Sequence, residues 1–133
     1  MFKTNRIMKS KTTKAVRHFY SEWLATRENH QVYSHSLRAR VTVNSSVSRR
    51  ETSHYAAINP LTMQMVLTAF DDILRYARKT GEFPPKPNSG QSRFVRLINL
   101  EREVKGLGVA KLTVGELPDG RLVQYCITAV PVA

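Results

Sequence analysis

The chain has 133 residues, of which 21 are lysine or arginine and 10 are aspartate or glutamate, giving a formal net charge of +11. This length suits one domain, and the single cysteine, Cys126, excludes an intramolecular disulfide and a cysteine-based metal site. The apolar runs fall short of the roughly 20 residues of a membrane helix, and the basic start lacks the apolar core of a secretory signal. We therefore expect a cytoplasmic protein that meets no membrane.

The positive charge is concentrated in the first half of the chain. Residues 1–60 hold eleven basic and three acidic residues, whereas residues 61–133 hold ten basic and seven acidic residues. Such an excess disfavours a compact chain through self-repulsion, and a polyanionic partner would relieve that repulsion. The charge pattern therefore predicts binding to nucleic acid, either DNA or RNA. An acidic protein surface within a nucleoprotein complex is the alternative partner.

The first predicted element is a basic helix. Residues 1–8 show no period, so we expect a flexible basic arm there, followed by a single α+β domain over residues 9–133. A helix is predicted over residues 10–29 because apolar side chains recur at helical spacing. Three aromatic residues lie in this apolar stripe, namely Phe19, Tyr20 and Trp23. We expect these rings to lie in the core, and a stacking platform for unpaired bases is the alternative.

Residues 31–58 are predicted to form a two-stranded ribbon with a polar turn at residues 44–46. Apolar and polar residues alternate before this turn, which is typical of a strand with one buried face, and the alternation after it is weaker. A two-residue turn would place Arg40 opposite Glu51. The ribbon would then carry several guanidinium groups, whose planar forks match phosphate oxygens. A solvated edge ribbon, whose charges prevent pairing with other chains, is the alternative.

The stretch from residue 59 to residue 81 is the clearest helix signal in the sequence. Asn59 can cap the helix, and Pro60 suits the first turn, where its missing N–H costs nothing. Gly81 can adopt the left-handed conformation that ends a helix. The apolar residues at three- and four-residue steps are Met63, Val66, Leu67, Phe70, Ile73, Leu74 and Ala77. We expect this helix to be the central element of the core.

The last third of the chain predicts a connection, a helix and a hairpin. Residues 81–92 are rich in proline, glycine and serine and should form an extended connection. A third helix is predicted over residues 93–105. Strands are predicted over residues 109–114 and 122–128, joined by a turn with proline and glycine at favoured positions. The predicted fold is therefore a single compact α+β domain, ordered helix, basic ribbon, central helix, helix and C-terminal β-hairpin.

The segment LEREVKGLGVAKLTVGELPDGRLVQYCIT resembles the recognition helix and wing of winged-helix regulators. The features that carry the resemblance are the helix ending at Leu107-Gly108-Val109, the turn with Asp119-Gly120-Arg121 and the return strand through Tyr125 and Thr128. The resemblance implies that Arg93, Arg96 and Arg102 lie near DNA and that Arg121 contacts the DNA backbone from the wing.

Catalysis is the enzymatic alternative. The four histidines are His18, His30, His35 and His54, and some registers of the ribbon bring the last two together. A metal-independent ribonuclease could use such histidines to move protons beside cations that stabilise the phosphate. No phosphate-binding glycine loop, dinucleotide motif or zinc-ligand set is present in the sequence. We therefore predict no catalytic residue, no cofactor and no metal site.

The sequence as a whole predicts a non-catalytic protein that holds the phosphate backbone of nucleic acid. The predicted contacts are Lys9, Lys11, Lys14 and Arg17 on the first helix and Arg38, Arg40, Arg49 and Arg50 on the ribbon. Phosphate contacts of this kind give strong salt dependence and modest sequence preference. The choice between DNA and RNA and the oligomeric state are left open by the sequence.

Overall fold

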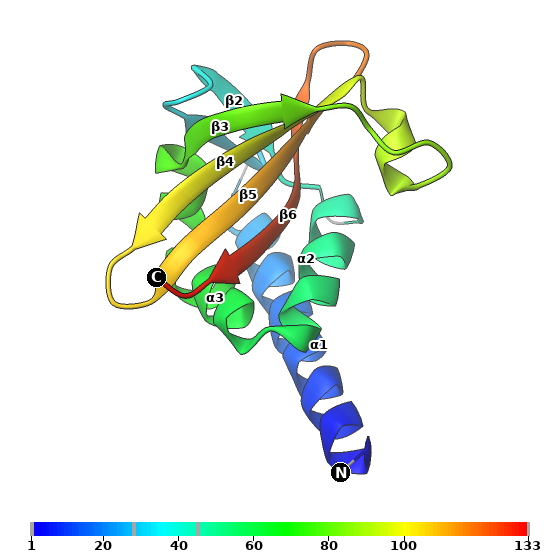
Figure 1. The fold of residues 1–133 in the computed structure, drawn as a ribbon, viewed down its shortest axis with the longest axis vertical. Helices are drawn as coiled ribbons and strands as arrows, with labels where there is room; N and C mark the ends of the chain where they lie inside the picture. The colour runs from blue at the N-terminus through cyan, green and yellow to red at the C-terminus, as the bar shows by residue number, and fades with distance from the viewer. Residues whose placement is uncertain (1, 28, 45, 133) are drawn as a thin grey trace.

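The computed structural model describes residues 2–27, 29–44 and 46–132, with side chains described from residue 14 onward in these ranges. The elements in chain order are α1 (Phe2–Ala25), β1 (Gln31–Ser34), β2 (Ala39–Thr42), α2 (Val47–Ile58), α3 (Pro60–Tyr76), β3 (Arg78–Phe83), the 3-10 helix η1 (Gly90–Arg93), β4 (Arg96–Val104), β5 (Gly108–Glu116) and β6 (Leu122–Val130). Within the described ranges, three α-helices accompany one curled six-stranded sheet, and the predicted mixed α+β class is confirmed (Figure 1).

The strand order in the sheet is β1-β2-β6-β5-β4-β3. Strands β3, β4, β5 and β6 form an antiparallel meander, and β1 pairs with β2 as a second antiparallel unit. The two units join through a short parallel contact, in which Val41 pairs with Leu122 and Thr42 with Val123. The N-terminal hairpin therefore adds to the edge of the C-terminal meander rather than standing apart from it.

One face of the sheet packs against α1 and α3. The rings of Phe19, Tyr20 and Trp23 on α1 each meet Phe70 of α3 edge to face, with centroids 5.2 to 5.4 Å apart. The sheet contributes fully buried side chains to the same core, among them Leu100, Leu112 and Ile127. The aromatic stripe of the first helix is therefore a core contact, as predicted.

Helix α2 lies along the part of β6 that β2 leaves unpaired (Figure 1). The Ser48 hydroxyl donates to the Gln124 carbonyl oxygen at 2.5 Å, and the Ile127 N–H donates to Thr52 Oγ1 at 3.3 Å. Side chains of a helix thus satisfy backbone groups that a neighbouring strand would otherwise bind. This replacement fixes the position of α2 against the sheet.

A buried polar network ties α1 to the same place. The Tyr20 hydroxyl lies 3.1 Å from both Thr52 Oγ1 and Gln124 Oε1, and Gln124 Nε2 donates to Thr52 Oγ1 at 3.1 Å. The contacts are compatible if Tyr20 donates to Gln124 and Thr52 donates to the Tyr20 oxygen. Burial raises the pKa of Tyr20 above its ordinary value of 10.0, so the phenol keeps its proton.

The second strand predicted for the ribbon, residues 47–58, is wrong, because these residues form α2. The helix starts where Asn44 Oδ1 accepts the N–H groups of Ser46 and Val47, so the residue expected in a hairpin turn caps a helix. The buried residues of α2 are Val47, Ser48, Thr52, Ser53 and Ala56. Three of these are hydroxylated, and the helical period is therefore invisible to a search for apolar residues.

The first strand of the predicted ribbon is also corrected. It divides into β1 and β2, which are joined by a turn in which Arg38 has a φ of 51°. Arg40 consequently pairs with Tyr33 across the hairpin and does not lie opposite Glu51. The observed two-stranded unit is thus shorter than predicted and carries two of the four ribbon arginines.

The third helix predicted over residues 93–105 is wrong, because β4 occupies residues 96–104. Ile98 and Leu100 face the main core, while Leu97 on the opposite face packs with Phe94 in a second apolar cluster. A strand with both faces covered loses its alternation in sequence, and its apolar residues then imitate helical spacing.

The ends of the remaining elements combine confirmed and corrected predictions. Helix α3 begins as predicted, with Asn59 Oδ1 accepting the Leu61 N–H at 3.1 Å and Pro60 in the first turn. It ends at Tyr76 rather than near Gly81, and the segment that follows forms β3. Where the C-terminal hairpin was predicted, β5 and β6 pair antiparallel in the sheet.

Helix α1 begins at Phe2, so residues 2–8 are helical where an irregular arm was predicted. The division into an arm and a domain over residues 9–133 stays a prediction. Among the described residues, no helix is both long enough and apolar enough to span a membrane.

Gly115 on β5 provides a test of the second apolar cluster. A Cβ atom at this position would lie 2.5 to 2.7 Å from three ring atoms of the buried Phe94. We expect Gly115→Ala to lower the free energy of unfolding by roughly 1–3 kcal/mol, because the ring must move within a packed cluster. Urea unfolding monitored by circular dichroism measures the change.

The matched control is Gly81→Ala on β3. A Cβ atom there would meet nothing within 4 Å. This variant should be as stable as the wild type or more stable, by up to about 1 kcal/mol. Equal stability of both variants would show that Phe94 does not lie over Gly115.

Candidate nucleic-acid interface

Arginines from α1 and α2 line one groove. Arg17 comes from α1, and Arg49 and Arg50 come from α2. The groove has a volume of about 430 Å³, and its other lining residues are Ser46, Ser53, His54 and Ala57. The lining positions on and before α2 recur at three- and four-residue steps, so they form one face of the helix. The Ser48 and Thr52 contacts to β6 hold that face in place.

The groove has a positive electrostatic balance. No carboxylate is among its lining residues, and no ion pair forms between Arg17 or Arg49 and any side chain that the structure describes. Arg50 has only a long contact, with its Nε 3.8 Å from Glu51 Oε1. The guanidinium charges are therefore available to an anion in the groove.

Several arginines outside the groove pair with acids, whereas others, such as Arg78, form no ion pair within the described ranges. Arg102 binds both carboxylate oxygens of Asp72 at 2.9 and 3.2 Å, and Arg96 binds Glu116 at 2.9 Å. Arg27 pairs with Asp71, which also accepts a hydrogen bond from the Trp23 indole. These acids thus neutralise three arginines away from the groove.

Ser53 adds an unsatisfied donor to the groove. Ser53 is among the residues that line the groove, but it is only 6% exposed, and its Oγ is buried without a hydrogen-bond partner among the described residues. A buried hydroxyl without a partner costs roughly 1–3 kcal/mol, so such a group is uncommon without a ligand. The hydroxyl of Thr62 is buried in the same way but lies outside the groove.

The structure separates the predicted site residues into two groups. Arg17, Arg49 and Arg50 meet in the groove, and Lys14 is exposed on α1 nearby in sequence. Lys9 and Lys11 belong to α1, and their side chains lie outside the described part. Arg38 and Arg40 are exposed on the hairpin of β1 and β2. The predicted clamp of four arginines on one ribbon is therefore wrong, because Arg49 and Arg50 lie on α2 and line the groove with Arg17 of α1.

Ser53 and His54 were missed as members of the site. Their spacing from Arg49 and Arg50 is helical, and this signal would have been readable if residues 47–58 had been predicted as a helix. In the ribonuclease alternative, some registers of the predicted ribbon would bring His54 to His35. The two histidines instead line different hollows, and the pairing needed for a ribonuclease on that ribbon is absent from the described structure.

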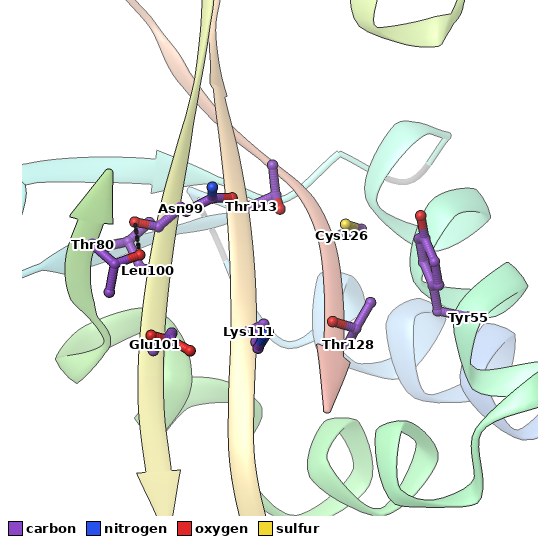
Figure 2. Close-up of a pocket in the computed structure, with 9 residues that line it drawn as sticks. All are labelled: Tyr55, Thr80, Asn99, Leu100, Glu101, Lys111, Thr113, Cys126 and Thr128. Atoms are coloured by element: carbon purple, nitrogen blue, oxygen red, sulfur yellow. Dashed lines mark hydrogen bonds between the residues drawn. The ribbon is translucent and has the colours of Figure 1, made fainter. Parts of the chain in front are cut away.

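A second hollow of about 510 Å³ lies on the sheet face opposite the main core (Figure 2). Glu101, Lys111 and Thr128 form one row across β4, β5 and β6, as the register requires. The other lining residues are Tyr55, Thr80, Asn99, Leu100, Thr113 and Cys126. This lining contains hydroxyl and amide groups, one lysine and one glutamate. Lys111 and Glu101 are neighbours across β5 and β4, so their charges offset each other.

The Cys126 thiol in this hollow has low reactivity near neutral pH. Burial raises its pKa to about 11, and the hydrogen bond to Thr113 offsets this only in part. The thiolate is the reactive form of cysteine, so the thiol is a poor nucleophile near neutral pH. In the described ranges, no group of three His, Cys, Asp or Glu side chains is arranged to hold a metal ion.

The structure contradicts the winged-helix resemblance. Its recognition helix would fall on residues that form β4, and Arg96 and Arg102 on this strand are engaged by Glu116 and Asp72. The hairpin of β5 and β6 belongs to the centre of the sheet rather than to a separate wing. Comparisons with protein-family models, with curated proteins and with solved structures find no match for this chain.

The burial of Cys126 predicts a distinct pH dependence of alkylation. In the folded protein, iodoacetamide should react slowly at pH 8 and faster as the pH approaches 11. In urea, the same thiol should titrate near its ordinary pKa of about 8.5. The two rates, measured by mass spectrometry, should therefore differ most between pH 8 and 10. Equal rates in both states would show that the thiol is exposed.

Proposed function

We propose that this protein binds nucleic acid without catalysis and holds phosphates in the groove between α1 and α2. The observation that carries this proposal is the convergence of Arg17, Arg49 and Arg50 on one groove that no carboxylate lines. Each guanidinium group offers a planar fork of donors that matches two phosphate oxygens. Three such groups from two helices suit a polymer with repeated negative charges.

The residues around these arginines support the same role. The Ser53 hydroxyl can donate to a phosphate oxygen, which would satisfy its buried donor. Lys14 extends the positive surface along α1, because residues three apart on a helix are neighbours. Contacts to phosphate carry no sequence information, so binding should depend on salt more than on base sequence.

An acidic protein surface could use the same groove. The salt dependence of the affinity distinguishes the two kinds of partner. Nucleic acid is a continuous line of phosphates that releases counterions on binding, so its affinity falls steeply with salt. A protein that stays bound after nuclease treatment of the purified material would favour the protein partner.

Loss of two groove arginines should weaken binding and reduce its salt dependence. We expect Arg17→Gln with Arg49→Gln to lower the slope of log affinity against log salt by about 1.4 to 1.8, which is two lost phosphate contacts. Titration of a labelled 20-nucleotide strand and a 20-base-pair duplex by fluorescence anisotropy at several salt concentrations gives the slope.

The charge-matched control is Lys86→Gln with Lys105→Gln. Both lysines are exposed on loops, and neither lines the groove. This control should keep the wild-type slope to within a few tenths. A wild-type slope in the groove variant, with circular dichroism unchanged, would place the phosphate contacts elsewhere.

Ser53→Ala separates stability from binding. Removal of an unsatisfied buried hydroxyl should leave the free energy of unfolding unchanged or raise it by about 1 kcal/mol. The affinity for nucleic acid should fall several-fold, because a charge-assisted hydrogen bond is lost. Thermal unfolding and anisotropy on the same samples measure both effects. Thr62→Ala, a buried hydroxyl outside the groove, should leave the affinity unchanged.

A further inference from the structure

Three aromatic rings form a partly exposed cluster beside the turn between β1 and β2. The His35 and Tyr76 rings are stacked, with centroids 5.1 Å apart and planes 6° from parallel. The Tyr33 ring meets His35 edge to face at 5.2 Å. Tyr33 and Tyr76 are 46% and 45% exposed, in contrast to the buried rings of the core.

Backbone contacts hold this cluster in place. The His35 N–H donates to the Arg75 carbonyl oxygen at 2.9 Å, and the Lys79 N–H donates to Ser36 Oγ at 2.9 Å. The turn is therefore docked on the end of α3 and the start of β3. Tyr76, at the last position of α3, lies against the ring that the turn brings to it.

Three basic residues lie beside the exposed rings, and acids pair with two of them. A hollow of about 530 Å³ is lined by His35, Ser36, Tyr76, Arg78, Lys79 and Arg102. The Arg102 guanidinium lies 5.3 Å from the Tyr76 ring centroid and is fixed there by Asp72. Arg78 forms no ion pair with a side chain in the described ranges, whereas Lys79 contacts Glu82 at 3.0 Å. Arg38 belongs to the same turn as His35.

Exposed rings within a basic hollow are suited to unpaired nucleobases. Scattered exposed tyrosines are ordinary, but a stacked group of rings edged by arginine and lysine combines the two elements of a single-strand site. His35 stacks on the Tyr76 ring and Arg102 lies over it, so the surface offered to a base is the exposed part of Tyr33 and Tyr76, and Arg78 is the cation free to contact the backbone. Bases inside a duplex already stack on one another, so they are not available to such a surface.

We propose that the cluster of Tyr33, His35 and Tyr76 stacks an unpaired base, so that the protein prefers single-stranded nucleic acid to duplex. This inference rests on the proposed function. It adds a preference for single-stranded over duplex nucleic acid, which phosphate contacts in the groove do not provide. Arg78, which forms no ion pair in the described ranges, contacts a phosphate beside the stacked base. A single strand then meets phosphate contacts at the groove and a base contact at the hollow.

The test compares strands with and without bases. The probes are a labelled 20-nucleotide thymidine strand, the same strand with abasic sites throughout, and a 20-base-pair duplex, each titrated by fluorescence anisotropy at low salt. Base stacking on an aromatic ring corresponds to roughly five- to 150-fold in affinity per base. The wild type should bind the thymidine strand at least about tenfold more tightly than the abasic strand.

The variants locate this preference. Tyr76→Ala should bind the two strands nearly equally, and Tyr76→Phe should keep the preference because it keeps the ring. Tyr55→Ala is the matched control, because Tyr55 is a partly exposed tyrosine outside the cluster, and it should behave as the wild type. Tyr33→Ala provides a second variant if Tyr76→Ala is poorly folded, since Tyr33 is the more exposed member on a surface strand.

The outcomes of this experiment separate the two proposals. Equal affinity of the wild type for the thymidine and abasic strands would overturn base stacking while leaving phosphate binding in the groove intact. A thymidine preference that survives Tyr76→Ala and Tyr33→Ala would also overturn the proposed location. Absence of binding to all three probes at low salt would overturn the proposed function itself, and the stacking site with it.

Discussion

The unpaired edge of β6 is the constraint on which the rest of the structure depends. A buried strand edge must find partners for its N–H and carbonyl groups, and β2 reaches only its first residues. Ser48 and Thr52 of α2 supply those partners from one helical face. Their sequence neighbours Arg49 and Ser53 then turn toward α1, where the groove forms. The same hydrogen bonds that complete the sheet therefore position the basic site.

Elements with local signals could be predicted from the sequence. The start of α3 was readable from Asn59 and Pro60, and the hairpin of β5 and β6 was readable from its turn. Helix α2 could not be found by apolar spacing, because serine and threonine form much of its buried face. Strand β4 was mistaken for a helix because Phe94 and Leu97 cover the face that alternation would leave polar.

The candidate site was predictable in composition but not in arrangement. The excess of basic residues in the first half indicated a polyanion, and Arg17, Arg49 and Arg50 were among the residues predicted to contact it. Their grouping depended on α2 being a helix. The aromatic cluster was hidden for a different reason, since Tyr33 and Tyr76 are far apart in sequence and meet through His35 only after the β1–β2 turn docks on α3.

The brief parallel contact between β2 and β6 has a consequence for motion. Two residue pairs join the N-terminal hairpin to the meander, further hydrogen bonds run to the end of α3 and the start of β3, and Val32 and Val41 pack in the main core. Few shared backbone bonds mean a low local opening free energy, so amides of this hairpin should exchange with solvent before those of β4, β5 and β6. Tyr33 of the aromatic cluster thus sits on an edge strand with few backbone bonds to the central sheet, which can adjust to a ligand while that sheet stays closed.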